Sequence, residues 1–303
     1  MPTEENVVLT KPLPPMRVRW LKALRAYSFP ASVVPVAVGV AAPFWAKAHI
    51  TWWTVPLVLA VGVLIHIGTN LINDVVDYEK GVDREGALGG SGVLLDGWLT
   101  PGQIRNAAIG AFVFAGIIGI PVLMIRGWPL VVIGAIGVLG GYFYTAPPLS
   151  LKYRALGDFI VYLCCGPLLV AGVSLAVCGI VPMAAIVAGL VVGLPVTALL
   201  VANNLRDMDD DRELKIRTLA MVFGPRWTKV EYLVLMIGAL VSAPVLAVFG
   251  VLPYTACLSI GALFVALRPI RDLVQGRVEE QVVERTAQFH LVFGMLLTLG
   301  LFL

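Results

Sequence analysis

The stretch NNLRDMDDDR, residues 203–212, comes directly after an apolar run at residues 181–202. The run is long enough to cross a bilayer as a helix. Asn203, Asp207 and Asp211 are spaced at i, i+4 and i+8, so they share one face if the helix continues. Carboxylates stacked on one face repel each other, and a divalent cation is the natural compensating charge. The stretch therefore predicts a metal-binding helix end at a membrane surface.

A second stretch, HIGTNLINDVVD at residues 66–77, also ends an apolar run of membrane length. Its Asn73 and Asp77 correspond to Asn203 and Asp207 at an offset of 130 residues. This repeat predicts an internal duplication, with two four-helix halves and one helix appended. It also predicts two metal-binding faces at equivalent helix ends, which meet across a common opening.

The same helix carries a polar stripe, because His66, Asn70, Asn73 and Asp77 recur at helical spacing. Polar groups at membrane depth are costly unless they face a cavity. A single histidine such as His66 is more often a hydrogen-bonded packing residue than a ligand. The stripe as a whole, however, indicates a cavity behind the metal-binding end.

The composition is that of a membrane protein. Of the 303 residues, 59% are hydrophobic and 14% are charged, and the mean hydropathy is +0.90. Ordinary soluble domains carry roughly 25% charged residues. We therefore predict an all-α integral membrane bundle of nine transmembrane helices. They are expected at residues 26–46, 52–73, 104–125, 129–144, 156–178, 181–205, 230–249, 252–266 and 288–303.

The distribution of charge predicts the orientation of this bundle. With these helices, 20 of the 22 Lys and Arg residues lie on one side of the membrane, and only Lys47 and Arg126 lie on the other. An excess of positive residues marks the cytoplasmic side. We expect a multi-pass protein of the plasma membrane with a cytoplasmic N-terminus and an exported C-terminus. All 19 acidic residues are then cytoplasmic, so the site faces the cytoplasm.

The domain organisation is expected to be simple. Residues 1–25 are predicted to form a cytoplasmic tail and an interfacial segment, and residues 26–303 a single transmembrane domain. No cleavable signal peptide is evident in the first 25 residues. No nucleic-acid motif accompanies the net charge of +3, and the four cysteines suit packing rather than a disulfide or zinc pattern.

Basic residues near the acidic motifs indicate an anionic ligand. Arg212 and Arg217 interleave with the carboxylates of the later motif, which suits a site that holds both metal and diphosphate. Lys152 lies in the loop at residues 149–158, where it could contact phosphate or anchor a helix end at the headgroups. The glycine-rich loop at residues 78–92 lacks the ending of a P-loop.

Mg²⁺ prefers one or two carboxylates together with substrate phosphates and water. Two such helix ends could each hold one ion, with a diphosphate between them, and an apolar bundle lies behind. The site therefore suits an amphiphile with a diphosphate head and a hydrocarbon tail. Ionisation of that molecule gives an allylic cation for an electron-rich acceptor, in a chamber that excludes water.

At these residues the chain resembles the UbiA-type intramembrane prenyltransferases. NDVVD at residues 73–77, followed by Asp83, looks like the first aspartate-rich motif of that superfamily. Asp207-x-x-x-Asp211 looks like the second, and the similarity covers about residues 24–223. The paired motifs are specific, whereas each alone is moderate evidence.

Within the superfamily the resemblance points to the 1,4-dihydroxy-2-naphthoate polyprenyltransferases (MenA-like) and their animal relatives. The delayed acid at Asp83, the run KYRALGD at residues 152–158, and NNLRD at residues 203–207 are similar to that branch, as is RTLA at residues 217–220. One departure is Leu214-Lys215, where that branch usually carries a glycine-containing pair.

The resemblance implies a role for each candidate residue. Asn73, Asp77 and Asp83 would bind Mg²⁺ on one face, and Asp207 and Asp211 on the other; Asn73, Asp77, Asp207 and Asp211 are the catalytic candidates. Lys152, Arg212 and Arg217 would contact diphosphate, and His66, Asn70 and Tyr144 would line the acceptor pocket. The implied reaction transfers a polyprenyl group from polyprenyl diphosphate to 1,4-dihydroxy-2-naphthoate, with release of diphosphate and CO2, in menaquinone biosynthesis.

Two alternatives remain open from the sequence. The same fold could use another acceptor, such as homogentisate, 4-hydroxybenzoate, haem, a chlorophyllide or a lipid glycerol phosphate. A membrane ion or lipid transporter would instead carry its polar residues through the membrane, whereas here they concentrate at one face. A calcium-binding loop is disfavoured, because Arg212 replaces the glycine and Thr218 the closing glutamate that such a loop requires.

Overall fold

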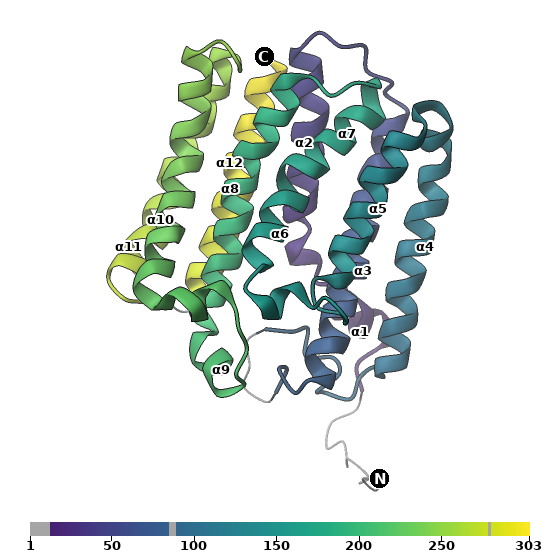
Figure 1. The fold of residues 1–303 in the computed structure, drawn as a ribbon, viewed down its shortest axis with the longest axis vertical. Coiled ribbons are helices and arrows are strands. Elements are labelled where there is room, and N and C mark those ends of the chain that lie inside the picture. Colours follow the sequence, from purple (N-terminus) through teal and green to yellow (C-terminus); the bar gives the residue numbers. More distant parts are fainter. Residues whose placement is uncertain (1–12, 85–88, 278–279) are drawn as a thin grey trace, which may run out of the picture.

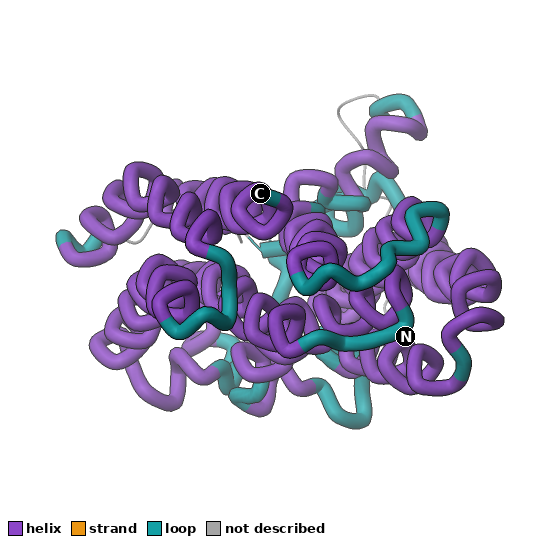
Figure 2. The backbone as a smooth tube through the Cα atoms, turned by 90° about the horizontal axis from the view of Figure 1, so that it is seen from above, coloured by secondary structure: helices purple, strands orange, loops and turns teal. Residues whose placement is uncertain are grey.

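The computed structural model of the chain describes residues 13–84, 89–277 and 280–303. These residues form an all-helical bundle, and no strand occurs among them. Most of the predicted tail, residues 1–12, and part of the glycine-rich loop, residues 85–88, lie outside the described residues. Figure 2 looks down on the bundle and shows only helices and loops.

The first half of the chain contributes four long helices. The short helices α1 (Met16–Ala23) and η1 (Ala26–Ser28) lead into α2 (Pro30–Trp45), and α3 (Thr54–Glu79), α4 (Pro101–Arg126) and α5 (Trp128–Phe143) follow. Thr100 and Gln103 close the start of α4 by bonding each other's backbone N–H groups, at 3.2 Å and 2.9 Å. These four long helices precede the second acidic motif, residues 203–212, in the chain.

The second half begins with η2 (Leu151–Arg154) and continues with α6 (Gly157–Leu163), a π-helical turn η3 (Cys164–Leu168), α7 (Leu169–Cys178) and α8 (Met183–Arg206). The remaining elements are α9 (Met208–Glu213), α10 (Leu219–Val248), η4 (Tyr254–Ala262), α11 (Leu263–Val274) and α12 (Glu280–Phe302). In Figure 1, α1 and α9 lie at one end of the bundle and the C-terminal end of α12 lies at the other.

The core of the bundle surrounds α8. Fifteen residues of α8 are buried, among them Val192 and Ala198, and they pack against α10, α12 and α2. By contrast no residue of α5 is buried, and exposed side chains such as Phe114 and Met124 cover α4. Exposed apolar faces on long helices are expected where lipid is the solvent. The protein is therefore a multi-pass membrane protein.

The predicted number of spans is confirmed only in part. Within the described residues six helices are long and apolar enough to cross a membrane, and a seventh is obtained if α1–η1 and α2, which meet at a 51° bend, form one span. The expected helices at residues 129–144 and 252–266 exist as α5, with 16 residues, and as η4 with the first residues of α11. The nine-span count stays a prediction.

Candidate active site

Asp77 lies in the last turn of α3 and is held by three side chains. Its carboxylate accepts hydrogen bonds from the Asn73 amide at 2.9 Å, the Lys152 ammonium at 2.7 Å and the Tyr153 hydroxyl. Asn73 is one helical turn away on the same face, as its spacing predicted. Lys152 and Tyr153 come from η2, the 3₁₀ turn that follows α5. The first motif is therefore in contact with a loop 75 residues away.

Asp83 lies in the loop after α3 and is buried beside the same motif. Its backbone N–H donates to the Asp77 carbonyl at 3.3 Å. Its carboxylate fills the space next to Gly90, where an added Cβ would lie 2.1 Å from the Asp83 Oδ2 atom. Burial, followed by the nearby charges of Asp77 and Asp74, raises the pKa of Asp83 to about 6. The charges of Arg25 and Lys152 oppose this shift but are outweighed by burial and the neighbouring carboxylates.

The second motif lies where α8 ends and α9 begins. Asp207 has non-helical backbone angles, φ −87° and ψ 5°, and separates the two helices. Its carboxylate forms a two-pronged ion pair with Arg206, at 2.6 Å and 2.9 Å. Asn203 turns back to the Leu199 carbonyl of its own helix, at 2.9 Å. The shared face of Asn203, Asp207 and Asp211 was expected if the helix continues; α8 ends at Arg206, yet the Asp207 and Asp211 N–H groups still donate to the Asn203 and Asp207 carbonyls, at 2.9 Å and 2.8 Å.

Asp211 is buried on α9 and faces the first half of the protein. The Thr218 hydroxyl lies 3.3 Å from its Oδ2 atom. Burial is the main effect that raises the pKa of Asp211 to about 6; Lys152 opposes the shift, and Asp207 and Asp77 add to it. Asp211 therefore lies within the electrostatic reach of Asp77 and of Lys152.

Lys152 connects the two motifs. Burial acts to lower its pKa, but the carboxylates of Asp77, Asp211 and Asp83 together raise it. The backbone agrees with this placement, because the Ala155 N–H next to η2 donates to the Arg217 carbonyl at 2.8 Å. The partly buried Lys152 ammonium thus bonds Asp77 and lies within the electrostatic reach of Asp83 and Asp211.

A divalent metal fits the donors that are present. In the part of the chain that the structure describes, no three His, Cys, Asp or Glu side chains lie close enough to make a complete metal site. Mg²⁺, however, takes one or two carboxylates and completes its shell with water and substrate phosphates. Asp83 and Asp211 offer carboxylate oxygens near other carboxylates. A bound cation would reduce the repulsion between these groups.

The three predicted diphosphate-binding residues differ in position. Lys152 lies between the motifs, as described above. Arg217 is exposed beside them, and its side chain has no hydrogen bond or ion pair within the described residues. Arg212 points away, since its guanidinium pairs with Asp209 at 2.6 Å on the outer face of α9 and is 60% exposed. The structure brings Lys152 to the site, leaves Arg217 at its edge and does not bring Arg212 there.

The predicted pocket residues lie deeper in the bundle. The ring nitrogens of His66 lie 3.0 Å from the Ser28 hydroxyl and 2.6 Å from the Ser32 hydroxyl. Asn70 donates to Ser28 at 3.0 Å. Hydroxyls of η1 and α2 therefore satisfy both side chains. The Tyr144 hydroxyl packs against Gly157, 3.4 Å from the position of an added Cβ.

Three contacts near the site were not predicted from the sequence. Tyr153 bonds Asp77. Arg25 and Asp74 form a buried ion pair at 2.5 Å, and Asn204 donates to the buried Asp158 at 3.2 Å. The signal for the ion pair was present, because an acid such as Asp74 inside a membrane helix requires a partner. The partner itself, 49 residues earlier in the chain, had no local pattern.

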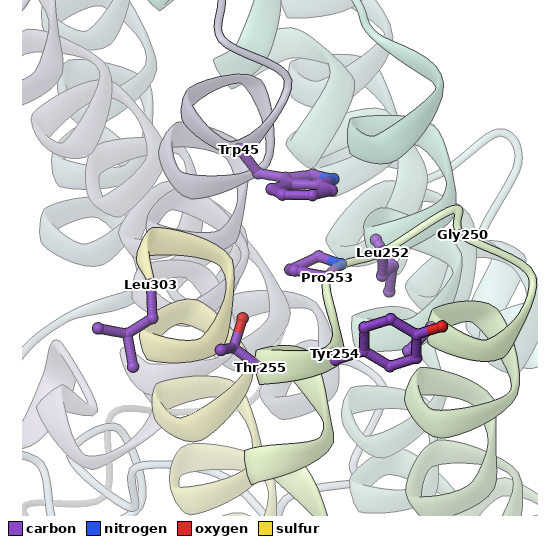
Figure 3. Close-up of a pocket in the computed structure, with 8 residues that line it drawn as sticks. Trp45, Gly250, Leu252, Pro253, Tyr254, Thr255 and Leu303 are labelled. Carbon is purple, nitrogen blue, oxygen red and sulfur yellow. The ribbon is translucent and has the colours of Figure 1, made fainter.

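Two cavities in the described part of the chain lie away from the acidic motifs. One, of about 590 Å³, is lined by Phe223, Trp227, Val230 and Glu231 of α10. The other, of about 380 Å³, lies near the C-terminal end of α12, where Trp45, Pro253 and Tyr254 face one another (Figure 3). Neither is lined by a residue of the two motifs.

The described residues form an all-helical membrane bundle with two acidic helix ends near a partly buried lysine. Residues 32–301 match the sequence profile of the UbiA prenyltransferase family. The chain therefore belongs to this family, and it is a prenyltransferase.

Curated relatives agree with this family. The chain is 26% identical to 1,4-dihydroxy-2-naphthoate octaprenyltransferase of Bacillus subtilis, over 91% of this chain and 90% of the relative. It is 29% identical to UbiA prenyltransferase domain-containing protein 1 of Gallus gallus, over 94% of this chain and 84% of the relative. Both alignments run through nearly the whole chain.

Solved structures share the fold at lower sequence identity. A UbiA homologue from Aeropyrum pernix superposes with a TM-score of 0.70 at 14% identity, over 91% of this chain and 97% of the other. A UbiA homologue from Archaeoglobus fulgidus bound to GPP and Mg²⁺ gives 0.62 at 12% identity, over 94% and 99% of the two chains. The arrangement of the helices is therefore the UbiA fold.

Proposed function

We propose that this prenyltransferase transfers a polyprenyl group from polyprenyl diphosphate to 1,4-dihydroxy-2-naphthoate, with release of diphosphate and CO2, as a step in menaquinone biosynthesis. The observation that supports a diphosphate site most directly is Lys152, whose ammonium bonds Asp77 of the first motif at 2.7 Å and acts electrostatically on Asp211 of the second. The naphthoate acceptor is supported by the relatives that carry that name, in Bacillus subtilis and in Mycobacterium tuberculosis, the latter at 28% identity.

The bond changes balance without an added reactant. The bond between prenyl C1 and the diphosphate oxygen breaks, and the electron pair leaves with diphosphate. The ring carbon that bears the carboxylate forms a bond to the resulting allylic cation. Cleavage of the bond from that carbon to the carboxylate then releases CO2 and returns an electron pair to the ring.

The residues of this chain have separate tasks in that reaction. Asn73, Asp77 and Asp83 would hold one Mg²⁺, and Asp207 and Asp211 another. When bound, Mg²⁺ supplies neutralisation of the charge that develops on the departing diphosphate. Lys152 and Arg217 bind the diphosphate oxygens, as charged hydrogen-bond donors do. The apolar bundle surrounds the prenyl chain and keeps water away from the cation.

We propose that His66, Asn70 and Tyr144 lie on the acceptor side of the site. His66 and Asn70 are polar at membrane depth and are already bonded to the hydroxyls of Ser28 and Ser32. Tyr144 lies near the carboxylates of Asp158 and Asp77. Together these residues provide hydrogen-bond partners for the hydroxyls of an aromatic acceptor, between the metal-binding motifs and the apolar interior.

Mass spectrometry of the products provides the test. Purified enzyme receives one prenyl diphosphate, Mg²⁺ and a panel of aromatic and lipid acceptors, with an EDTA-treated sample as the metal control. The proposal expects a prenylated naphthalene product that has lost the mass of CO2, and only with Mg²⁺ present. Product from another acceptor, and none from 1,4-dihydroxy-2-naphthoate, would overturn the acceptor assignment.

Another acceptor is the second candidate. One fold neighbour is described as digeranylgeranylglyceryl phosphate synthase, with a TM-score of 0.61 and 14% identity. A likeness at that identity concerns the fold, so the fold is compatible with both aromatic and lipid acceptors. A glycerol phosphate acceptor in the same panel would give an ether product without loss of CO2, which separates the two functions.

We also propose that the site faces the cytoplasm. The helices α1 and α9 lie at one end of the bundle (Figure 1), and they carry Arg17, Arg19, Lys22 and Arg212. Arg126 is at the other end, where its guanidinium bonds the Thr51 hydroxyl at 2.8 Å and the Ala176 carbonyl at 2.9 Å. The positive-inside rule then places α1 and α9 in the cytoplasm of a cell whose plasma membrane holds the protein.

A further inference from the structure

Arg84 joins the two acidic loops from outside the site. Its guanidinium donates to Asp210 at 2.6 Å and to Glu213 at 2.8 Å. These partners are 126 and 129 residues away in the chain, on α9. Arg84 directly follows Asp83, and Asp210 directly precedes Asp211. The ion pair therefore connects the backbone next to one proposed metal ligand with the backbone next to another.

The ion pairs of Arg84 contribute little to the stability of the fold. The side chains of Arg84, Asp210 and Glu213 are 33%, 46% and 68% exposed. Exposed ion pairs contribute little to folding, because water screens them and long side chains lose entropy. Other ion pairs at this end of the bundle, such as that of Arg105 with Glu79 at 2.6 Å, connect neighbouring helices of one half.

The two loops would otherwise repel each other. Asp83 on one loop and Asp211 on the other are both buried near further carboxylates. Inside the site the Lys152 ammonium bonds Asp77 and lies within electrostatic reach of both carboxylates. On the outer side the Arg84 guanidinium spans from one loop to the other. Its length and its forked donors suit two carboxylates one turn apart on α9.

We propose that Arg84 is a positioning residue that sets the separation of the two acidic loops, so that both motifs can bind one diphosphate. This inference rests on the proposed diphosphate site, but it does not depend on which acceptor the enzyme uses. Arg84 contacts neither substrate nor metal. Its loss widens the distance that a bound diphosphate must bridge. The affinity for the substrate therefore falls more than the turnover rate of the bound complex.

Three variants test this role. Arg84→Asp removes the connection and places a third acid beside Asp210 and Glu213. Arg84→Asp combined with Asp210→Arg restores an ion pair in the reverse sense. Arg105→Ala is the matched control, because it removes an equally charged group from an exposed ion pair that does not cross between the halves. Thermal unfolding in detergent verifies that each variant is folded.

The measurements are Mg²⁺-dependent binding of prenyl diphosphate by calorimetry, without acceptor, and then KM and kcat with the best acceptor. Arg84→Asp is expected to weaken binding and raise KM by about tenfold, with kcat changed by less than about twofold. The reversed pair should recover most of the affinity, and Arg105→Ala should bind like the wild type.

Other results would overturn either the role of Arg84 alone or the diphosphate site as well. Wild-type affinity in a folded Arg84→Asp variant would overturn the positioning role and leave the proposed function intact. The same would follow if the reversed pair recovered nothing, or if kcat alone fell. Absence of Mg²⁺-dependent binding in the wild type would overturn both the diphosphate site and the role of Arg84. A different acceptor would change neither binding result.

Discussion

Two carboxylates of the acidic motifs already hold a cation of the protein itself. Asp77 pairs with Lys152 at 2.7 Å, and Asp207 pairs with Arg206 at 2.6 Å. Each of these carboxylates therefore lies where a positive charge can approach it, which a metal ligand also requires.

Substitution of Asp77 tests directly whether this carboxylate is a metal ligand. Asp77→Asn keeps the size and part of the hydrogen bonding of the side chain but removes its charge. We expect turnover to fall by more than about 100-fold, because the proposed metal loses a ligand, while circular dichroism in detergent remains that of the wild type. Asp207→Asn should behave in the same way. Asp209→Asn, 96% exposed on α9, is the control that should retain activity.

The ion pair between Arg25 and Asp74 has a structural role that its burial predicts. The two side chains are 12% and 1% exposed and lie 2.5 Å apart. Removal of one partner leaves an uncompensated buried charge, which costs about 3–5 kcal/mol. Arg25→Ala should therefore lower the free energy of unfolding by that amount in a denaturant titration. Arg105→Ala, from a pair 47% exposed on both sides, should cost about 0–1 kcal/mol. Equal losses in the two variants would contradict the assignment.

At the scale of elements, close packing around α8 depends on glycine. An added Cβ at Gly189 would lie 2.7 Å from the Pro167 Cα atom of η3, and one at Gly166 would lie 2.8 Å from the Gly193 Cα atom. Small residues let helix backbones approach in membranes. Here they allow the π-helical turn between α6 and α7 to lie directly against the first half of α8.

Gly189→Ala measures the value of this contact. The methyl group would meet backbone, which cannot move aside easily, so we expect a loss of about 1–3 kcal/mol in unfolding free energy. Gly134→Ala on α5 is the matched control, because no atom lies within 4 Å of the position of its added Cβ. That variant should be neutral or more stable by up to about 1 kcal/mol, since alanine is the better helix former. Similar stability in both variants would show that α8 and η3 can separate without cost.

At the scale of the whole molecule, the orientation proposed for the bundle rests on the difference in charge between its two ends. Single cysteines in a background without the native cysteines report it. Asp209→Cys on α9 should react with a membrane-impermeant maleimide only in inverted vesicles. Trp128→Cys at the start of α5, 75% exposed, should react only in right-side-out vesicles. The reverse pattern would place the active site on the exported side.

Much of the fold could be predicted from the sequence, because a membrane imposes local rules. Long apolar runs must be helical where water is absent, so residues 54–79 and 183–206 could be assigned without their neighbours. The motif containing Asn73 and Asp77 keeps its face because α3 runs unbroken through it. The end of α8 at Arg206 and the start of α9 at Met208 could not be predicted in the same way, because this interruption depends on how that end packs.

The sequence by itself determined the class of the protein and its all-helical membrane character, and it supplied the acidic residues proposed for the site, since these depend on composition and on spacing within single helices. Only the tertiary structure decided which cation meets which carboxylate. Lys152 and Tyr153 reach Asp77, Arg25 reaches Asp74, and Arg84 reaches Asp210, across 49 to 126 residues. Such pairs are chosen by the packing of separate helices, and no local pattern records that packing.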